Sequence, residues 1–294
     1  MKEEVMVSVI MVTHNHEKYI EEAIHGVLMQ ECDFGYELII ANDHSTDKTG
    51  EVIQRILLEN PKAAVINYLY RDANLGSADN FIDAIKQSKG AYISLCDGDD
   101  YWTDTLKLQK QVDFLEKNNE YSMVCHDALV IDEPKNSSYL YFTDAHQKQI
   151  CSTKDIFGIR FCPTASMLFR KRALISVDFP GFKILAGDLF LQLLISLDGP
   201  IYRMYEVMSV YRMTSTGVTQ TNKRDQKGLI RNRISLIKYI DEISHKKYHK
   251  YIRLETLLMR SDIDYLNGKS TIRILMLKIY RKALFTYRKR VFSS

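Results

Sequence analysis

The chain has 294 residues, of which 46% are hydrophobic and 26% are charged, and its net charge is +3. This composition is typical of a soluble globular protein, and the length allows one large domain or a domain with an appendage. The five cysteines are widely spaced and form no CxxC pair, which argues against a disulfide framework and against a zinc site. The sequence shows no apolar stretch of membrane-spanning length and no signal peptide, so we expect a cytoplasmic protein.

The first hundred residues alternate short apolar runs with segments of helical period, a pattern typical of a parallel sheet with crossover helices. We expect strands at residues 7–13, 36–41, 64–70 and 92–96. Between them we expect a helix over residues 20–28, a helix capped by Ser45 or Thr46, and a helix over residues 77–88.

After residue 100 the alternation is looser. The pattern predicts helices at 103–117 and 188–197, strands at 122–131, 165–170 and 200–211, and a polar loop at 134–149. From about residue 228 onward the sequence has only helical signals. We therefore predict one α/β domain over residues 1–222 and a C-terminal helical region over residues 223–294.

Each of the first four expected strands ends in polar residues. These ends read Thr13-His14-Asn15-His16, Asn42-Asp43-His44-Ser45, Arg71-Asp72-Ala73-Asn74-Leu75-Gly76 and Asp97-Gly98-Asp99-Asp100. The carboxyl ends of parallel strands meet at one edge of a sheet, where ligands of such sheets bind. We therefore expect one shared binding site at this edge.

The motifs that are missing narrow the choice of ligand. The chain has no GxGxxG after a strand and no GxxxxGK[ST], so neither a dinucleotide fingerprint nor a P-loop is present. A diphosphate would then need a divalent cation, and Asp97-x-Asp99 supplies the oxygen ligands that Mg²⁺ and Mn²⁺ prefer. An EF-hand is excluded because Trp102 and Leu108 stand where its Gly and Glu would be.

The ordered motifs resemble the family 2 glycosyltransferases of GT-A fold. The resemblance is nearly continuous over residues 7–115 and returns more weakly at 164–170, 187–188 and 210–219. It implies a GT-A (Rossmann-like nucleotide-binding) mostly parallel sheet flanked by helices. It also implies a nucleotide-diphosphate sugar donor, most often a UDP-sugar, and inverting transfer.

The resemblance also implies roles for residues that match the family's motifs. Thr13, His14 and Asn15 would hold the base and ribose, and Asp43 would accept a hydrogen bond from the base edge. Asn74, Gly76 and Asn80 would line the donor pocket. Asp99 would bind Mn²⁺ or Mg²⁺ directly, and Asp97 would hold the ribose or a metal-bound water. Arg212 would pair with the diphosphate.

The family's catalytic base lies in an acidic pair at the start of a helix after the sheet. In this chain Gly187 stands at the position of the first acid, so Asp188 alone is the candidate base. An Asp at the start of a helix is often only a helix cap. The chain also has Thr214 where many relatives have His. The QxxRW motif of processive synthases is absent, because the only tryptophan is Trp102. We therefore expect the addition of a single sugar.

The C-terminal tail concentrates the positive charge. Residues 269–294 contain eight Lys and Arg and no acid, and a helical wheel places the basic side chains opposite an apolar arc. Such a helix suits an anionic membrane surface at the inner face of the cell membrane, where a lipid-linked acceptor would lie. A helix packed on the domain with a solvated basic face is the alternative. Nucleic acid is not expected, because the rest of the chain is net acidic.

The sequence thus predicts an inverting, non-processive glycosyltransferase of bacterial surface polysaccharide synthesis, acting on a glycan or lipid-linked acceptor. Its rivals are a nucleotide-sugar-binding protein without transfer, a nucleotidylyltransferase and a structural metal-binding domain. A nucleotidylyltransferase would open with a Gly-rich motif near the first strand, and that motif is missing. A binding module would keep its ligand affinity after Asp99→Ala, and a structural metal-binding domain would not bind UDP.

Overall fold

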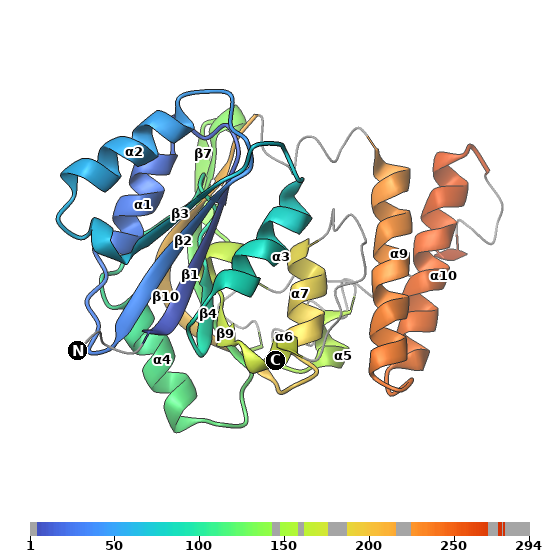
Figure 1. Ribbon diagram of the computed structural model, residues 1–294. Helices are drawn as coiled ribbons and strands as arrows, with labels where there is room; N and C mark the ends of the chain where they lie inside the picture. Colours follow the sequence, from blue (N-terminus) through green and yellow to red (C-terminus); the bar gives the residue numbers. More distant parts are fainter. Residues whose placement is uncertain are drawn as a thin grey trace.

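A computed structural model of the protein describes residues 5–142, 148–157, 162–175, 187–215, 225–269, 276, 277 and 279. Within these residues a ten-stranded sheet has the order β3-β2-β1-β4-β9-β6-β10-β5, with β7 beside β6 and β8 beside β10. Helices cover both faces of the sheet (Figure 1). The predicted α/β class, with helices toward the C-terminus, is confirmed.

The first half of the sheet is built from four parallel strands joined by three helices. The strands are β1 (Val5–Thr13), β2 (Gly35–Asn42), β3 (Ile66–Tyr70) and β4 (Tyr92–Leu95). The helices are α1 (Ile20–Leu28), α2 (Thr49–Glu59) and α3 (Ser77–Gln87), and the 3-10 turn η1 (Ala63–Val65) precedes β3. The pattern of apolar residues predicts the four strands and three helices, but not the start of α2 or the turn η1, whose residues 64 and 65 were expected to begin β3.

Helix α2 starts later than expected, and the predicted cap by Ser45 or Thr46 is wrong. The carboxylate of Asp47 accepts hydrogen bonds from the backbone N–H and the hydroxyl of Thr49, at 2.9 and 2.6 Å. Ser45 and Thr46 instead contact the polar turn that follows β1, through Asn15. The tertiary contact between two loops therefore overrides the local capping signal.

The strands bury side chains on both faces, as parallel strands between two helical layers must. In β1, Val7, Val9 and Met11 pack with α1 and α2, whereas Ile10 belongs to the apolar cluster on the opposite face, which includes α3 and α7 (Gly187–Ile195). All four side chains are at most 1% exposed. Alternation along a strand thus assigns each residue to one of two cores.

The second half of the sheet is mixed. Strand β9 (Leu168–Arg170) runs antiparallel between β4 and β6 (Met123–Asp132), and β10 (Ile201–Met213) runs parallel to β6. Three short strands pair antiparallel with this half, namely β5 (Tyr101–Trp102), β7 (Ser137–Leu140) and β8 (Ile150–Cys151). The expectation of a loop throughout residues 134–149 is wrong, because β7 pairs antiparallel with β6 and forms a hairpin with it.

The later helices are α4 (Lys107–Lys117), α5 (Thr153–Ile156), α6 (Arg172–Ile175), α7, α9 (Gln226–Ile243) and α10 (His249–Leu266). Two further 3-10 turns are η2 (Glu133–Lys135) and η3 (Thr164–Ser166). Helix α4 begins at Lys107, four residues after the predicted start at residue 103.

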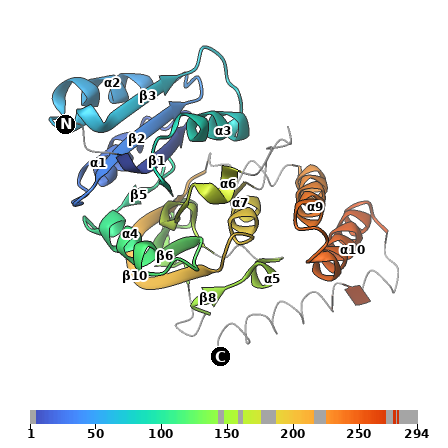
Figure 2. The ribbon, with the colours of Figure 1, turned by 60° about the horizontal axis from the view of Figure 1, so that its bottom comes forward.

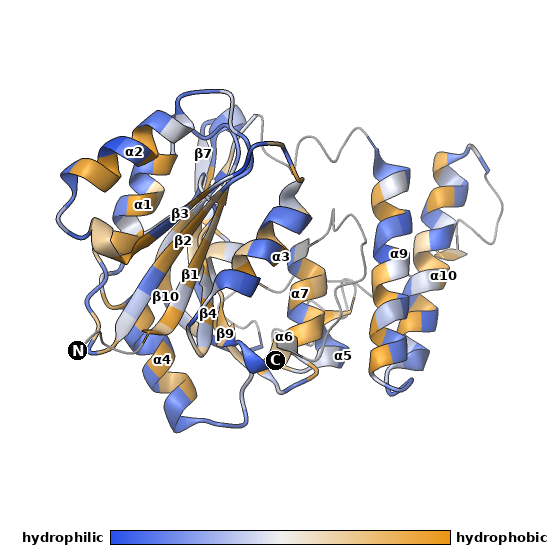
Figure 3. Cartoon of the chain, in the orientation of Figure 1, coloured by the Kyte–Doolittle hydropathy of each residue, from blue (hydrophilic) through white to orange (hydrophobic). Residues whose placement is uncertain are grey.

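Helices α9 and α10 lie side by side, with α9 next to α7 (Figures 1 and 2). Hydrophobic and hydrophilic residues alternate along both helices (Figure 3), and Ile234, Ile237 and Ile240 of α9 share an apolar cluster with α7. The helical character predicted from residue 228 onward is confirmed for residues 228–243 and 249–266. The division into domains at residues 222 and 223 stays a prediction.

Most of the basic tail lies outside the described residues. The part outside includes all five basic residues of its predicted polar arc, namely Arg273, Lys278, Arg281, Lys282 and Arg288. Of its apolar arc, Met276 and Ile279 are described, and their exposed fractions are 65% and 62%. Among the helices that the structure describes, none is both long enough and apolar enough to cross a bilayer.

Candidate active site

Four polar loops meet at the edge of the sheet where β1, β2, β3 and β4 end (Figure 1). Backbone hydrogen bonds join them. The N–H of Asp43 donates to Thr13 O at 2.9 Å, that of Arg71 to Asn42 O at 3.1 Å, and that of Gly98 to Val12 O at 3.0 Å. The structure thus brings together the loops that the sequence assigns to one site.

His14 and Asn15 form the turn that leaves β1. The Nδ1 atom of His14 lies 2.8 Å from Asp43 O, and Asn15 adopts a positive φ of 57°. The N–H of Asn15 donates to Ser45 Oγ at 3.0 Å, which ties this turn to the one that leaves β2. These predicted nucleotide contacts lie at one place, although their role toward a base and ribose stays a prediction.

Asp43 organises the loop after β3. Its Oδ1 accepts the N–H of Leu75 at 2.7 Å, and its Oδ2 accepts that of Gly76 at 3.0 Å. Gly76 has a φ of +85°, a conformation that glycine adopts without strain. Asn74 completes the turn by donating to Asp43 O at 3.2 Å. Each carboxylate oxygen keeps a second lone pair, so the predicted bond to a base edge is compatible with this arrangement.

Asn80 lies behind this loop rather than on its surface. Its side chain is 1% exposed, donates to Ala41 O at 2.8 Å and accepts from Arg71 Nε at 3.1 Å. These bonds connect α3 to the end of β2. Asn80 therefore supports the predicted donor pocket from within, and its contact with a donor is untested.

The loop after β4, residues 97–100, concentrates negative charge and is called the acidic loop below. Burial, followed by the charges of Asp99 and Asp188, raises the pKa of Asp97 from 3.8 to about 7. Asp188 is partly buried in the first turn of α7, where its Oδ1 accepts the N–H of Leu189 at 2.8 Å. Two carboxylates, Asp99 of the same loop and Asp188 of the distant helix α7, therefore act on Asp97 at this edge.

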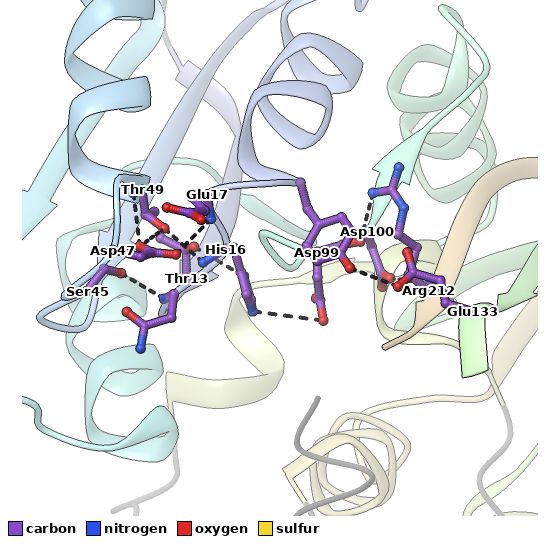
Figure 4. Close-up of polar contacts among 12 residues, drawn as sticks. Thr13, His16, Glu17, Ser45, Asp47, Thr49, Asp99, Asp100, Glu133 and Arg212 are labelled. Carbon is purple, nitrogen blue, oxygen red and sulfur yellow. Dashed lines mark hydrogen bonds and ion pairs between the residues drawn. The ribbon is translucent and has the colours of Figure 1, made fainter. Parts of the chain in front are cut away.

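His16 belongs to the polar strand ends expected at this site, but the sequence predicts no role for it. Its Nε2 lies 3.9 Å from Asp99 Oδ2, and its Nδ1 lies 3.2 Å from Thr13 Oγ1 (Figure 4). Burial lowers the pKa of His16, and the charge of Asp99 opposes this effect. A second histidine in a polar turn after a strand was the available signal. A side chain on Gly98 would clash here, because its Cβ would lie 2.9 Å from His16 Nδ1.

Asp100 and Arg212 join the acidic loop to β10. The backbone N–H of Arg212 donates to Asp100 Oδ1, and its guanidinium Nη1 donates to Asp99 O, both at 2.9 Å (Figure 4). Asp100 is 1% exposed, and burial together with the charges of Asp99 and Asp97 raises its pKa well above the usual range. The prediction that Arg212 pairs with a diphosphate is untested, and in this structure the guanidinium contacts the chain itself.

Comparison with known proteins assigns the family. The sequence model described as "Glycosyl transferase family 2" matches residues 8–177. The chain belongs to this family. An uncharacterized protein of Mycobacterium tuberculosis is 32% identical over 222 residues, which are 75% of this chain and 62% of that protein. A Bacillus subtilis relative, TuaG, is provisionally named a teichuronic acid biosynthesis glycosyltransferase and is 31% identical over 134 residues, covering 44% and 51% of the two chains.

Solved structures share the fold of this family 2 chain. Residues 1–349 of TarS from S. aureus match with a TM-score of 0.65 and 17% identity, over 94% of this chain and 78% of that one. The mannosyltransferase PcManGT of Pyrobaculum calidifontis, solved with GDP-Man and Mn²⁺, matches with a TM-score of 0.61 and 17% identity, over 99% and 84%. At these identities the likeness shows the fold alone.

The donor atoms of the acidic loop fit a divalent cation in part. Among the residues that the structure describes, no group of three or more His, Cys, Asp or Glu side chains could enclose a metal ion. Asp97 and Asp99 nevertheless offer carboxylate oxygens at one place, and burial together with the charges of Asp99 and Asp188 raises the pKa of Asp97, so a cation there would be favourable. Mg²⁺ and Mn²⁺ are commonly held by one or two carboxylates together with substrate phosphates and water. A site that a phosphorylated substrate completes is therefore the arrangement that fits.

Proposed function

We propose that this chain is an inverting, non-processive glycosyltransferase that moves one sugar from a nucleotide-diphosphate sugar to a glycan or lipid-linked acceptor. The observation that carries the proposal is that Asp97, Asp99 and Asp188 come together at the carboxyl edge of the sheet, where the charges of Asp99 and Asp188 add to burial in raising the pKa of Asp97. Such a cluster suits a metal-bound diphosphate on one side and a general base on the other.

The donor is proposed to be a UDP-sugar bound at the loops after β1 to β4. Support comes from the fold shared with TarS, one structure of which is a complex with UDP-GlcNAc. PcManGT, of similar fold, was solved with GDP-Man, so a GDP-sugar is the donor to test against it. We assign the base and ribose to Thr13, His14, Asn15 and Asp43, and the pocket behind the sugar to the loop of Asn74 and Gly76.

In the proposed reaction, the acceptor oxygen forms a bond to the anomeric carbon as the bond from that carbon to the diphosphate breaks. Asp188 takes the proton of the acceptor hydroxyl, on the face opposite the leaving group. Mn²⁺ or Mg²⁺, held through Asp99 and Asp97, would neutralise the charge of the leaving diphosphate. His16 lies beside Asp99 and would hold that carboxylate in place.

The acceptor is proposed to belong to bacterial surface polysaccharide synthesis, because TuaG carries a name from that process. The basic tail over residues 269–294 would bring the enzyme to an anionic membrane surface. Pelleting with anionic vesicles, comparing the intact chain with a variant that ends at Gly268, tests this location. Equal pelleting of the two proteins would contradict it.

A thermal-shift screen of UDP-, GDP- and dTDP-sugars, with and without Mn²⁺, tests the proposed function. A ligand that binds the native state at 100 times its Kd stabilises it by about 2.7 kcal/mol, so a metal-dependent rise in Tm is expected for the true donor. No metal-dependent rise with any of these sugars would contradict the proposal. Stabilisation without sugar release or transfer would favour a nucleotide-sugar-binding protein.

A further inference from the structure

The acidic loop spans two separate parts of the sheet. It leaves β4 near the centre, and within a few residues the chain enters β5, which pairs with β10 at the far edge. Tyr101 lies opposite Val210 and Trp102 opposite Ser209. The loop itself turns tightly, because the N–H of Asp100 donates to Asp97 O at 3.0 Å. The position of the loop between the two parts of the sheet therefore depends on its contacts with β10.

Arg212 is the residue of β10 that contacts the acidic loop. Its backbone N–H binds the side chain of Asp100, and its guanidinium binds the backbone oxygen of Asp99. One residue thus holds the loop at two consecutive positions. The proposed metal ligand Asp99 lies within the turn from Asp97 to Asp100, and its own backbone oxygen is one of the two points of attachment.

The guanidinium of Arg212 is itself fixed from several sides. Its Nη2 forms an ion pair with Glu22 of α1. Its Cζ lies 4.5 Å from the ring centre of Tyr101 and 5.1 Å from that of Tyr19. The hydroxyl of Tyr19 in turn donates to Glu133 Oε2 at 2.8 Å. The Arg212 side chain is only 9% exposed, whereas that of Glu22 is 53% exposed.

We propose that Arg212 is a positioning residue and that Glu22 orients it, so that the pair sets where the carboxylates of Asp97 and Asp99 lie. This inference rests on the proposed function, because it assumes that these carboxylates hold a divalent cation. The planar guanidinium can bind Glu22 and the Asp99 carbonyl at the same time, and a lysine ammonium cannot reproduce that fork. Outer contacts of this kind orient metal ligands and affect metal affinity.

Titration with Mn²⁺ alone, followed by the loss of the free-ion signal in electron paramagnetic resonance, tests the proposal on the full chain. Glu22→Gln and Arg212→Lys are each expected to raise the Kd for Mn²⁺ about 10- to 100-fold. Glu21→Gln is the matched control. Glu21 is the neighbouring residue in α1 and pairs with Arg55 at 2.6 Å, away from the acidic loop. The Glu21→Gln variant should bind Mn²⁺ with the Kd of the wild type.

The outcomes separate this inference from the proposed function. If wild-type protein binds Mn²⁺ and both variants bind it equally well, the positioning role is wrong while the proposed function stands. If the wild type binds no Mn²⁺ on its own, the positioning role is contradicted, whereas the thermal-shift screen with nucleotide sugars and Mn²⁺ still decides the proposed function. A loss of affinity for UDP but not for UMP in Arg212→Lys, with Mn²⁺ affinity unchanged, would assign Arg212 to the diphosphate and overturn the positioning role. Because Glu22 is half exposed, Glu22→Gln gives a result even if Arg212→Lys does not fold.

Discussion

Replacing Asp97 by Asn should stabilise the protein in the absence of metal, although it removes a residue of the proposed site. Burial and the charges of Asp99 and Asp188 raise the pKa of Asp97 from 3.8 to about 7. A difference of this size corresponds to about 4 kcal/mol, an upper limit that solvent screening reduces. The amide of Asn has the shape of the carboxyl group but no charge, so it removes this penalty.

The effect has a defined pH dependence. Below pH 3.8 the carboxyl group is protonated in both states, and the wild type carries no penalty. As the pH rises from about 4 to about 7, the unfolded state loses the proton first, so the free energy of unfolding of the wild type falls. Above pH 7 the penalty is complete. The advantage of Asp97→Asn should therefore grow over this interval and stay constant above it.

Thermal unfolding in the presence of a chelator, at pH 4.5 and pH 8, measures this difference. For a chain of this size each kcal/mol corresponds to about 2 °C in Tm, so Asp97→Asn should melt several degrees higher than wild type at pH 8. Asp72→Asn removes an exposed carboxylate from a neighbouring loop and serves as the control. A variant that is less stable than wild type at pH 8, or an advantage that does not grow with pH, would refute the reasoning.

Two further substitutions test other parts of the site, and a third tests a buried lysine of α4. Asp188→Asn should lower kcat by about 10²- to 10⁴-fold while calorimetry shows unchanged UDP affinity; a small loss of kcat would exclude it as the base. Gly98→Ala should lower the free energy of unfolding in urea by about 1–3 kcal/mol, because the new Cβ would lie 2.6 Å from Thr13 Oγ1. Full stability would show that the loop can move. Burial lowers the pKa of Lys107 from 10.5 to about 7, so wild-type stability should gain a rising contribution between these pH values. In Lys107→Met this contribution is absent, so the change in Tm between pH 6.5 and pH 9.5 should differ from that of the wild type. The same change in Tm in both proteins would contradict the reasoning.

The sequence predicts the first half of the fold well because its signals are local. Strands β1 to β4 are apolar runs bounded by polar turns, and each observed strand starts and ends within two residues of the expectation. Their parallel arrangement follows from the helices between them. No such periodicity exists for Tyr101 and Trp102, since two residues cannot show a repeat. Their strand exists only because β10, more than a hundred residues later, pairs with them.

The sequence predicts that the polar strand ends meet at one edge, but it does not predict the geometry there. Residue types at strand ends identify Asp43 and Asp99, and the family resemblance adds Arg212, but neither shows which atoms these side chains bind. Asp43 uses both carboxylate oxygens on the backbone of the next loop, and Arg212 binds the loop of Asp99. Glu22 gave no signal at all, because an acid in the first turn of a helix is explained by the helix dipole.

In the acidic loop, repulsion between carboxylates is opposed by hydrogen bonds from Arg212, and both affect the binding of a metal ion. The raised pKa values of Asp97 and Asp100 show that the loop is unfavourable when its carboxylates are ionised. The contacts of Arg212 hold it in place despite this repulsion. A divalent cation that binds there would relieve the repulsion without requiring the loop to move. Added Mn²⁺ should therefore raise the Tm of the wild type at pH 8 more than at pH 5, and it should do so less in Asp97→Asn, where the repulsion is already reduced.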